Sequence, residues 1–106
     1  MITAAEARGK MEKSSFIIQM REKMALALSI LSKRITERAE EGYNFLEVND
    51  QDPEFSKNIF NIPEFTAKTR REMFQADLIK SLKSNGYEIY RDDYFSELKT
   101  TLTIQW

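Results

Sequence analysis

The amino-acid sequence predicts an α+β fold, in which a long N-terminal helix, a short strand, a second helix and a C-terminal β-hairpin follow one another. Three observations support this class: apolar residues recur at helical spacing before Gly42, they do so again before Gly86, and apolar and polar residues alternate at the C-terminal end. We expect a three-stranded antiparallel sheet with both helices on one face. Because 106 residues fit one domain, residues 1–106 are interpreted as a single α+β domain.

The first helix is predicted to begin after Thr3 and to end at Gly42. Thr3 and Glu6 form a capping box, in which the Thr3 hydroxyl accepts a hydrogen bond from the Glu6 amide. Gly42 suits the left-handed conformation that often ends a helix. Between these ends, one face of the helix carries an apolar stripe made of Phe16, Ile17, Met20, Met24, Ala27, Leu28, Leu31 and Ile35.

The length of this helix raises a question about its first turns. One helix over residues 4–41 would span roughly 57 Å, whereas a compact domain of this size is about 33 Å across. Either the helix breaks near Ser14 and Ser15, or its first turns project from the body, so residues 1–14 are a candidate helical arm. A projecting helix would favour a partner, because apolar residues follow one side of it: Ala4, Ala7, Met11 and Ile18.

Three apolar residues of the long helix lie away from the main stripe or at its margin, namely Ile18, Leu26 and Ile30. One interpretation is that they mediate self-association, which predicts a homo-oligomer. The other is that further elements cover them, or that they stand singly on the surface as apolar residues often do.

The middle of the chain is predicted to hold a strand and an irregular segment. Tyr43–Val48 is rich in aromatic and β-favouring residues and predicts a short strand. Asn49–Pro63 is predicted to be irregular, yet it carries several large apolar side chains, among them Phe55 and Phe60. Either this segment folds over the edge of the core, or it is an exposed recognition segment that binds a partner through these two aromatic residues.

A second helix is predicted over Glu64–Asn85, with an apolar face made of Phe74, Leu78, Ile79 and Leu82. Its start is open, because both the Asn61–Glu64 and the Thr69–Glu72 stretches fit helix-capping patterns. The C-terminal hairpin is then predicted as a strand over Tyr87–Tyr90, a turn region over Arg91–Ser96 and a strand over Leu98–Trp106.

Composition argues against an enzyme and against a bound cofactor or metal. The chain has no histidine and no cysteine, which removes the commonest general base, the commonest metal ligand and every thiol nucleophile. Asp50 and Asp52, with Glu47 and Glu54, lack the glycine and glutamate positions of a calcium loop, so we interpret them as a solvated acidic turn. The pair Asp92–Asp93 is likewise interpreted as turn chemistry.

Lys68, Arg70 and Arg71 cluster at the start of the second helix. They are interpreted as an ordinary solvated basic turn, as a contact for an acidic protein partner, or as a site for a nucleotide or nucleic acid aided by Tyr87 and Tyr90. With a net charge of −1, tight nonspecific binding of nucleic acid is not expected. The sequence holds no secretory signal and no apolar run of membrane-spanning length, so we expect a cytoplasmic protein without a membrane partner.

The chain resembles a type of small accessory protein of tailed bacteriophages to which no chemistry is assigned. The likeness lies in Thr3–Arg8, which reads Thr-Ala-Ala-Glu-Ala-Arg, in Gly86-Tyr87, and in the final Leu102–Trp106, which reads Leu-Thr-Ile-Gln-Trp. The resemblance implies a phage or prophage accessory protein, in the host cytoplasm if of phage origin, and carries over no functional residues.

The leading hypothesis is a non-enzymatic interaction module that self-associates through Ile18, Leu26 and Ile30 and binds or occludes a host or virion protein. Its partner contacts would be Phe55, Phe60, Lys68, Arg70 and Arg71. Two alternatives remain: an oligomer that sequesters a small phosphorylated ligand or nucleotide, and a minor virion structural component.

Overall fold

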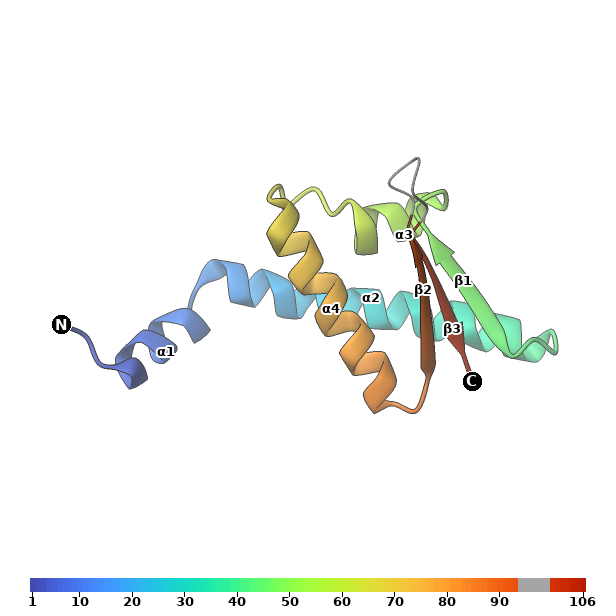
Figure 1. Ribbon diagram of the computed structural model, residues 1–106, viewed down its shortest axis with the longest axis horizontal. Coiled ribbons are helices and arrows are strands. Elements are labelled where there is room, and N and C mark those ends of the chain that lie inside the picture. Colours follow the sequence, from blue (N-terminus) through green and yellow to red (C-terminus); the bar gives the residue numbers. More distant parts are fainter. Residues whose placement is uncertain (94–99) are drawn as a thin grey trace.

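The computed structural model describes residues 1–93 and 100–106, with side chains described for 1–91 and 101–106. It is an α+β fold, as predicted (Figure 1). The elements in chain order are α1 (Ala4–Glu12), α2 (Ser15–Glu40), β1 (Phe45–Asn49), α3 (Pro53–Phe55), the π-helical turn η1 (Ser56–Phe60), α4 (Lys68–Ser84), β2 (Glu88–Asp93) and β3 (Thr100–Gln105).

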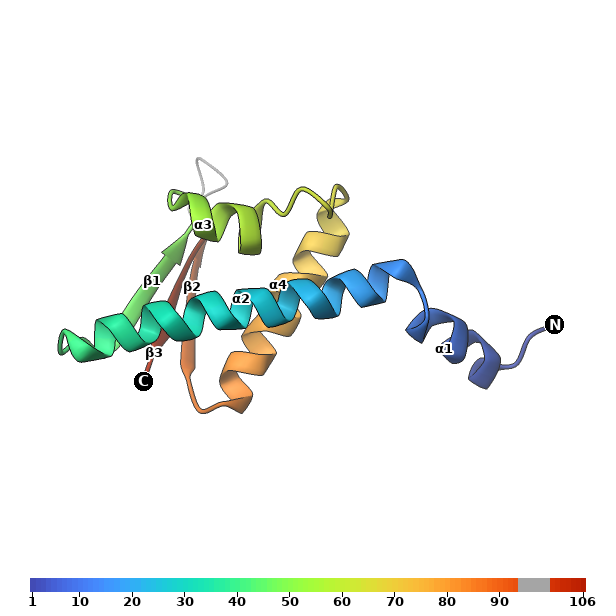
Figure 2. The ribbon, with the colours of Figure 1, turned by 180° about the vertical axis from the view of Figure 1, so that it is seen from behind.

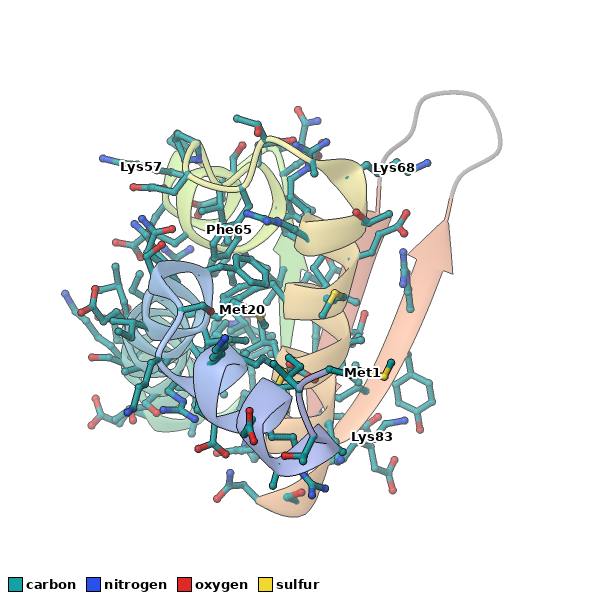
Figure 3. The ribbon with its side chains drawn as sticks, turned by 90° about the vertical axis from the view of Figure 1, so that its left-hand side faces the viewer. Met1, Met20, Lys57, Phe65, Lys68 and Lys83 are labelled. Carbon is teal, nitrogen blue, oxygen red and sulfur yellow. The ribbon has the colours of Figure 1, made fainter. Side chains whose placement is uncertain are left out.

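The three strands form an antiparallel sheet in the order β1-β3-β2, so the last strand of the chain lies in the middle. Ile104 of β3 is in register with Leu46 of β1 and with Ile89 of β2. The side chains of this row, together with Val48 and Leu102, face the helices. Helix α2 packs on β1 and α4 packs on β2, and Figure 3 places both helices on the same side of the sheet. The predicted sheet with its helices on one face is therefore confirmed.

The core lies between this face of the sheet, α2 and α4. Helix α2 contributes Met20, Ala27, Leu31 and Ile35 from its predicted stripe, and α4 contributes Phe74, Leu78 and Leu82. The segment between β1 and α4 closes the core from a third side, with Phe55, Ile59, Phe60, Ile62 and Phe65 all buried. Phe65 joins the helices, because its ring lies 5.8 Å from that of Phe16 and 5.7 Å from that of Phe74, centroid to centroid.

The long helix breaks where the sequence predicts, and its first part also projects from the body. Ser14 begins a new helix, since its Oγ accepts a hydrogen bond of 3.2 Å from the amide of Ile17. Thr3 caps α1 in the same way, accepting a bond of 3.2 Å from the amide of Glu6. Figure 2 shows α2 running through the molecule with α1 extending beyond it. The molecule measures 56 × 32 × 20 Å as a result.

Helix α2 ends at Gly42 through a left-handed residue, as predicted. Gly42 has φ +90°, its amide donates to the carbonyl of Ala39 at 3.0 Å, and the amide of Tyr43 donates to the carbonyl of Arg38 at 3.0 Å. This pair of bonds is the Schellman motif, which satisfies carbonyls that a helix end otherwise leaves open. The chain thereby turns back, and β1 begins two residues later than the predicted strand.

The segment after β1 is helical over Pro53–Phe60 rather than irregular, which corrects the prediction. Asp52 caps α3, because its Oδ1 accepts a hydrogen bond of 2.9 Å from the amide of Glu54, and Pro53 occupies the first helical position. Phe55 and Phe60 are only 1% and 7% exposed. This segment folds over the core, so the expectation that these two rings are exposed anchors is corrected.

The second helix and the hairpin differ from the prediction at their ends. Helix α4 begins at Lys68 with Ala67 as its N-cap residue, so neither predicted capping pattern marks its start. Strand β2 extends to Asp93, which places 91–93 in the sheet rather than in a turn. The predicted turn residues up to Ser96 and the predicted strand start at Leu98 lie outside the described residues. The main-chain amide of Trp106 donates to the carbonyl of Asn44 at 3.0 Å, which extends the β1–β3 pairing.

Candidate interaction surfaces

Helix α1 is fully formed but does not pack its side chains against the described body of the protein. None of its nine residues is buried against the described part of the chain. Met11 is 53% exposed, and Ala4 and Ala7 on the same side of the helix are exposed as well. An isolated helix shorter than about 12 residues is marginal in water. The arm therefore presents an apolar side whose burial would stabilise it.

A groove lies beside the base of this arm, between α2 and α4. Its floor is apolar and comes from α2, through Ile17, Met20 and Met24. Its rim is charged and polar and is formed by Arg21, Asp77, Lys80 and Ser81. The volume of the groove is about 340 Å³. In Figure 3, seen from the arm side, Met20 lies between α2 and α4.

The three predicted self-association residues do not form one patch. Leu26 is 44% exposed, and Ile30, one turn further along the same side, is half-buried against the core. Ile18 is 46% exposed but lies two turns earlier, which is about 12 Å along the helix. The structure therefore brings Leu26 and Ile30 together and places Ile18 nearer the arm.

The three basic residues at the start of α4 already have partners within the chain. Arg71 donates through Nη1 to the carbonyls of Phe65 and Thr66, each at 3.0 Å, which fixes the loop that leads into the helix. Arg70 stacks its guanidinium 4.1 Å from the centroid of the Phe16 ring. The Nζ of Lys68 lies 3.8 Å from a carboxylate oxygen of Glu72. Arg71 therefore acts within the fold, while Lys68 and Arg70 keep exposed surface.

The proposed stacking pair Tyr87 and Tyr90 is divided between different environments. Tyr90 is 53% exposed, and its hydroxyl donates to Glu88 at 2.8 Å, an interaction that raises the pKa of Tyr90. Tyr87 packs against the core and meets the ring of Trp106 edge-on at 6.5 Å. Together with the internal contacts of Arg71, this arrangement gives little support to a nucleotide site.

Arg34 is a central residue that sequence reasoning missed. It projects from α2 and bonds Asp52 at 2.7 Å and Glu54 at 3.3 Å, while its guanidinium lies 4.5 Å from the centre of the Phe55 ring. The hydrogen bond from Arg34 lowers the pKa of Asp52. The acidic turn is thus tied to α2 by an arginine, and no group of three metal-ligating side chains occurs among the described residues.

A second missed arginine fixes the turn between α2 and β1. Arg38 stacks on Tyr43, with 3.7 Å between the guanidinium carbon and the ring centre, and lies 5.5 Å from the centre of the Phe45 ring. The i to i+5 spacing of Arg38 and Tyr43 around a helix-ending glycine is the sequence signal that could have revealed this contact.

The fold and these surfaces define a small two-layer α+β domain that carries a projecting N-terminal helix. Within the described residues, no helix combines the length and the apolar character needed to cross a bilayer. Comparisons with protein-family models, with curated proteins and with solved structures find no match to this chain.

Proposed function

We propose that this protein is a non-enzymatic interaction module that self-associates through its N-terminal helices. The observation that carries the proposal is the arm: α1 forms nine residues of helix yet buries none of them against the described part of the chain. A helix this short gains most of its stability from packing. A second molecule is the simplest source of such packing.

The exposed apolar residues of α1 and α2 support the same proposal. Met11, Ile18 and Leu26 are each between 44% and 53% exposed. Single apolar residues are common on the surface of monomers and carry little weight alone. Here they support self-association because Met11 lies on the unpacked arm and Ile18 and Leu26 lie on the helix that follows it.

A further protein partner would contact the start of α4. Lys68 and Arg70 keep exposed cationic surface there, which suits an acidic partner. The resemblance to phage accessory proteins favours a host or virion protein for this role, in the host cytoplasm. Membership of the virion is a separate hypothesis, and mass spectrometry of purified particles would test it.

Light scattering after size exclusion tests self-association directly. We expect the wild-type chain to be an oligomer at high micromolar concentration. If the exposed side of α2 that carries Leu26 forms the interface, Leu26→Glu should raise the dissociation constant by at least ~10-fold, which corresponds to about 1.4 kcal/mol. Ser29→Glu is the matched control, since it adds the same charge at an exposed site of the same helix without removing an apolar residue.

A wild-type chain that remains strictly monomeric over this concentration range would contradict the proposal. A Leu26→Glu variant that associates as well as the control would remove Leu26 from the interface, while leaving association itself in place.

A further inference from the structure

We infer that α1 of one copy lies in the α2–α4 groove of a second copy, and that the two copies exchange their arms around a twofold axis. This inference rests on the proposed self-association and names a surface for it about 160° around α2 from Leu26, so arm exchange predicts that Leu26→Glu weakens the dimer no more than Ser29→Glu does. A helix seated in an apolar groove is a common mode of recognition, and twofold dimers are the commonest oligomers.

The apolar residues of the arm and of the groove nearly match in spacing. The arm carries Ala4, Ala7 and Met11, and the groove floor carries Ile17, Met20 and Met24, so in an antiparallel pairing a step of three residues on one stripe lies opposite a step of four on the other, a mismatch of one residue. A twofold axis near Lys13 and Ser14 sets the two stripes antiparallel. Ala4 of each copy then faces Met24 of the other, Ala7 faces Met20, and Met11 faces Ile17.

This pairing places small residues opposite large ones. Alanine on the arm lets the helix approach closely, and the flexible side chains of Met20 and Met24 fill the space that remains. Met20 is only 8% exposed and Met24 is half-buried, so the body of the protein already holds the floor of the groove in place. The arm would cover the part of these side chains that the body leaves open.

The charges along the two surfaces are partly complementary in the same register. Arg70 stacks on Phe16, and Asp77 lines the groove beside Met20 and Met24, so α4 crosses α2 obliquely here with Arg70 nearer to the arm than Asp77 is (Figure 1). An antiparallel arm brings Arg8 toward Asp77 and Glu12 toward Arg70. Opposite charges meet at both positions, and the pair of Glu12 with Arg70 favours this direction of the arm, whereas Arg8 would also lie near the rim cations Arg21 and Lys80.

The connection between α1 and α2 favours a second copy over the chain's own groove. Only Lys13 and Ser14 lie between the two helices, and Ser14 is held as the cap of α2 by its bond to the Ile17 amide. In this arrangement α1 extends away from the body (Figures 1 and 2). Short hinges of this kind favour exchange between copies.

Two alanines of the arm provide a matched pair of variants. Ala7 lies on the side that enters the groove, and Ala5 lies about 200° around the helix axis from it. Both are exposed residues near the start of α1, where an aspartate is compatible with the helix dipole. Ala7→Asp should raise the dissociation constant of the dimer at least ~10-fold, whereas Ala5→Asp should leave it within about threefold. Equal effects of the two variants would overturn the inference.

Disulfide trapping distinguishes exchange from docking within one chain. The sequence contains no cysteine, so introduced thiols report only on the chosen pair. In the double variant Ala7→Cys/Ser81→Cys, arm exchange yields covalent dimers on a non-reducing gel after mild oxidation. Docking of the arm in its own groove yields a bridged monomer, which would overturn the inference. The control Ala5→Cys/Ser81→Cys should form few bridges of either kind.

Light scattering of the wild-type chain separates the two proposals. If the wild-type chain is an oligomer, but Ala7→Asp does not weaken it and Ala7→Cys/Ser81→Cys forms no more bridges than its control, self-association holds and arm exchange is overturned. A wild-type monomer overturns the proposed function itself.

Discussion

Arg34 shows how one side chain organises the segment that closes the core. It reaches from α2 to Asp52 and Glu54, and covers the ring of the buried Phe55. Asp52 is also the N-cap residue of α3. The same carboxylate therefore begins this helix and anchors it to α2. Because the ion pair holds the Asp52 carboxylate in its charged form, the pKa of Asp52 is lowered in the folded state.

Stability should therefore depend on pH through Asp52. A lowered pKa in the folded state stabilises the protein above the ordinary value of 3.8, and this stabilisation is lost as pH falls below it. Asp52→Asn keeps an acceptor for the cap but removes the charge. At pH 7 we expect a loss of about 0.5–1 kcal/mol in the free energy of unfolding, as for a partly exposed ion pair. Urea unfolding at pH 7 and pH 3 should show the difference shrinking at the lower pH.

The control for this prediction is Asp50→Asn, which removes a charge from the same turn without a contact to Arg34. Its free energy of unfolding at pH 7 should match that of the wild type. A difference between Asp52→Asn and wild type that persists at pH 3 would show that the amide disturbs the cap rather than the ion pair.

Gly42 is the second residue on which a local structure depends. At φ +90° a side chain is strained whatever space surrounds it. Gly42→Ala should lower the free energy of unfolding by about 1–2 kcal/mol. Gly9→Ala is the contrasting variant, because Gly9 lies inside α1, where alanine favours the helix. A chemical denaturation series in which both variants behave alike would contradict this assignment.

At the scale of elements, β3 has the greatest influence because it pairs with both other strands. Ile104 is fully buried between α2, α4 and the sheet, and Thr103 beside it points to the opposite face. Ile104→Ala should cost about 2–5 kcal/mol in the free energy of unfolding. Thr103→Ala should cost less than about 1 kcal/mol. Equal losses in thermal or urea unfolding would mean that the Thr103 face is covered too.

The sequence predicts elements best where a periodic pattern extends over many residues. The stripe of α2 and the alternation of β3 each identify a buried face from spacing alone, and Gly42 and Ser14 mark ends through local chemistry. The Asp52-Pro53-Glu54 stretch carries a capping signal that could have revealed α3. The turn η1 leaves no such signal, because it has no side-chain cap, and its residues Ile59 and Phe60 are buried in the core.

Features formed by contacts distant in the sequence are harder to predict. The start of α4 at Lys68 is a local case that was also missed, because its N-cap residue Ala67 makes no side-chain cap hydrogen bond and so leaves no capping pattern in the sequence. The groove exists only because α2 and α4 lie side by side at Met20 and Asp77. Sequence reasoning identified the apolar residues of the arm, but not the surface that could receive them.

At the scale of the whole molecule, a packed body and an unpacked arm share one chain. The radius of gyration is 15.7 Å, whereas a compact chain of this length has about 13 Å. Such a molecule should not be uniformly stable, since an element with few buried contacts opens more easily than the core.

Hydrogen exchange followed by mass spectrometry should reveal this difference. At low protein concentration, the amides of Ala4–Glu12 should exchange nearly as fast as in an unfolded peptide, while those of α2 and β3 remain protected. At high concentration, the arm should become protected as it docks on a second copy. Protection of the arm that is strong and independent of concentration would contradict both the projecting arm and its exchange.

The central place of β3 also bears on how the protein is made. During translation, β1 leaves the ribosome about fifty residues before the strand that completes its hydrogen bonding, and β2 likewise precedes β3. The nascent chain must therefore hold two unpaired strands until the final stretch is synthesised. A product terminated before residue 100 would lack the strand that joins β1 to β2 and would leave the apolar faces of its helices without Leu102 and Ile104, which makes it a substrate for chaperones and proteases.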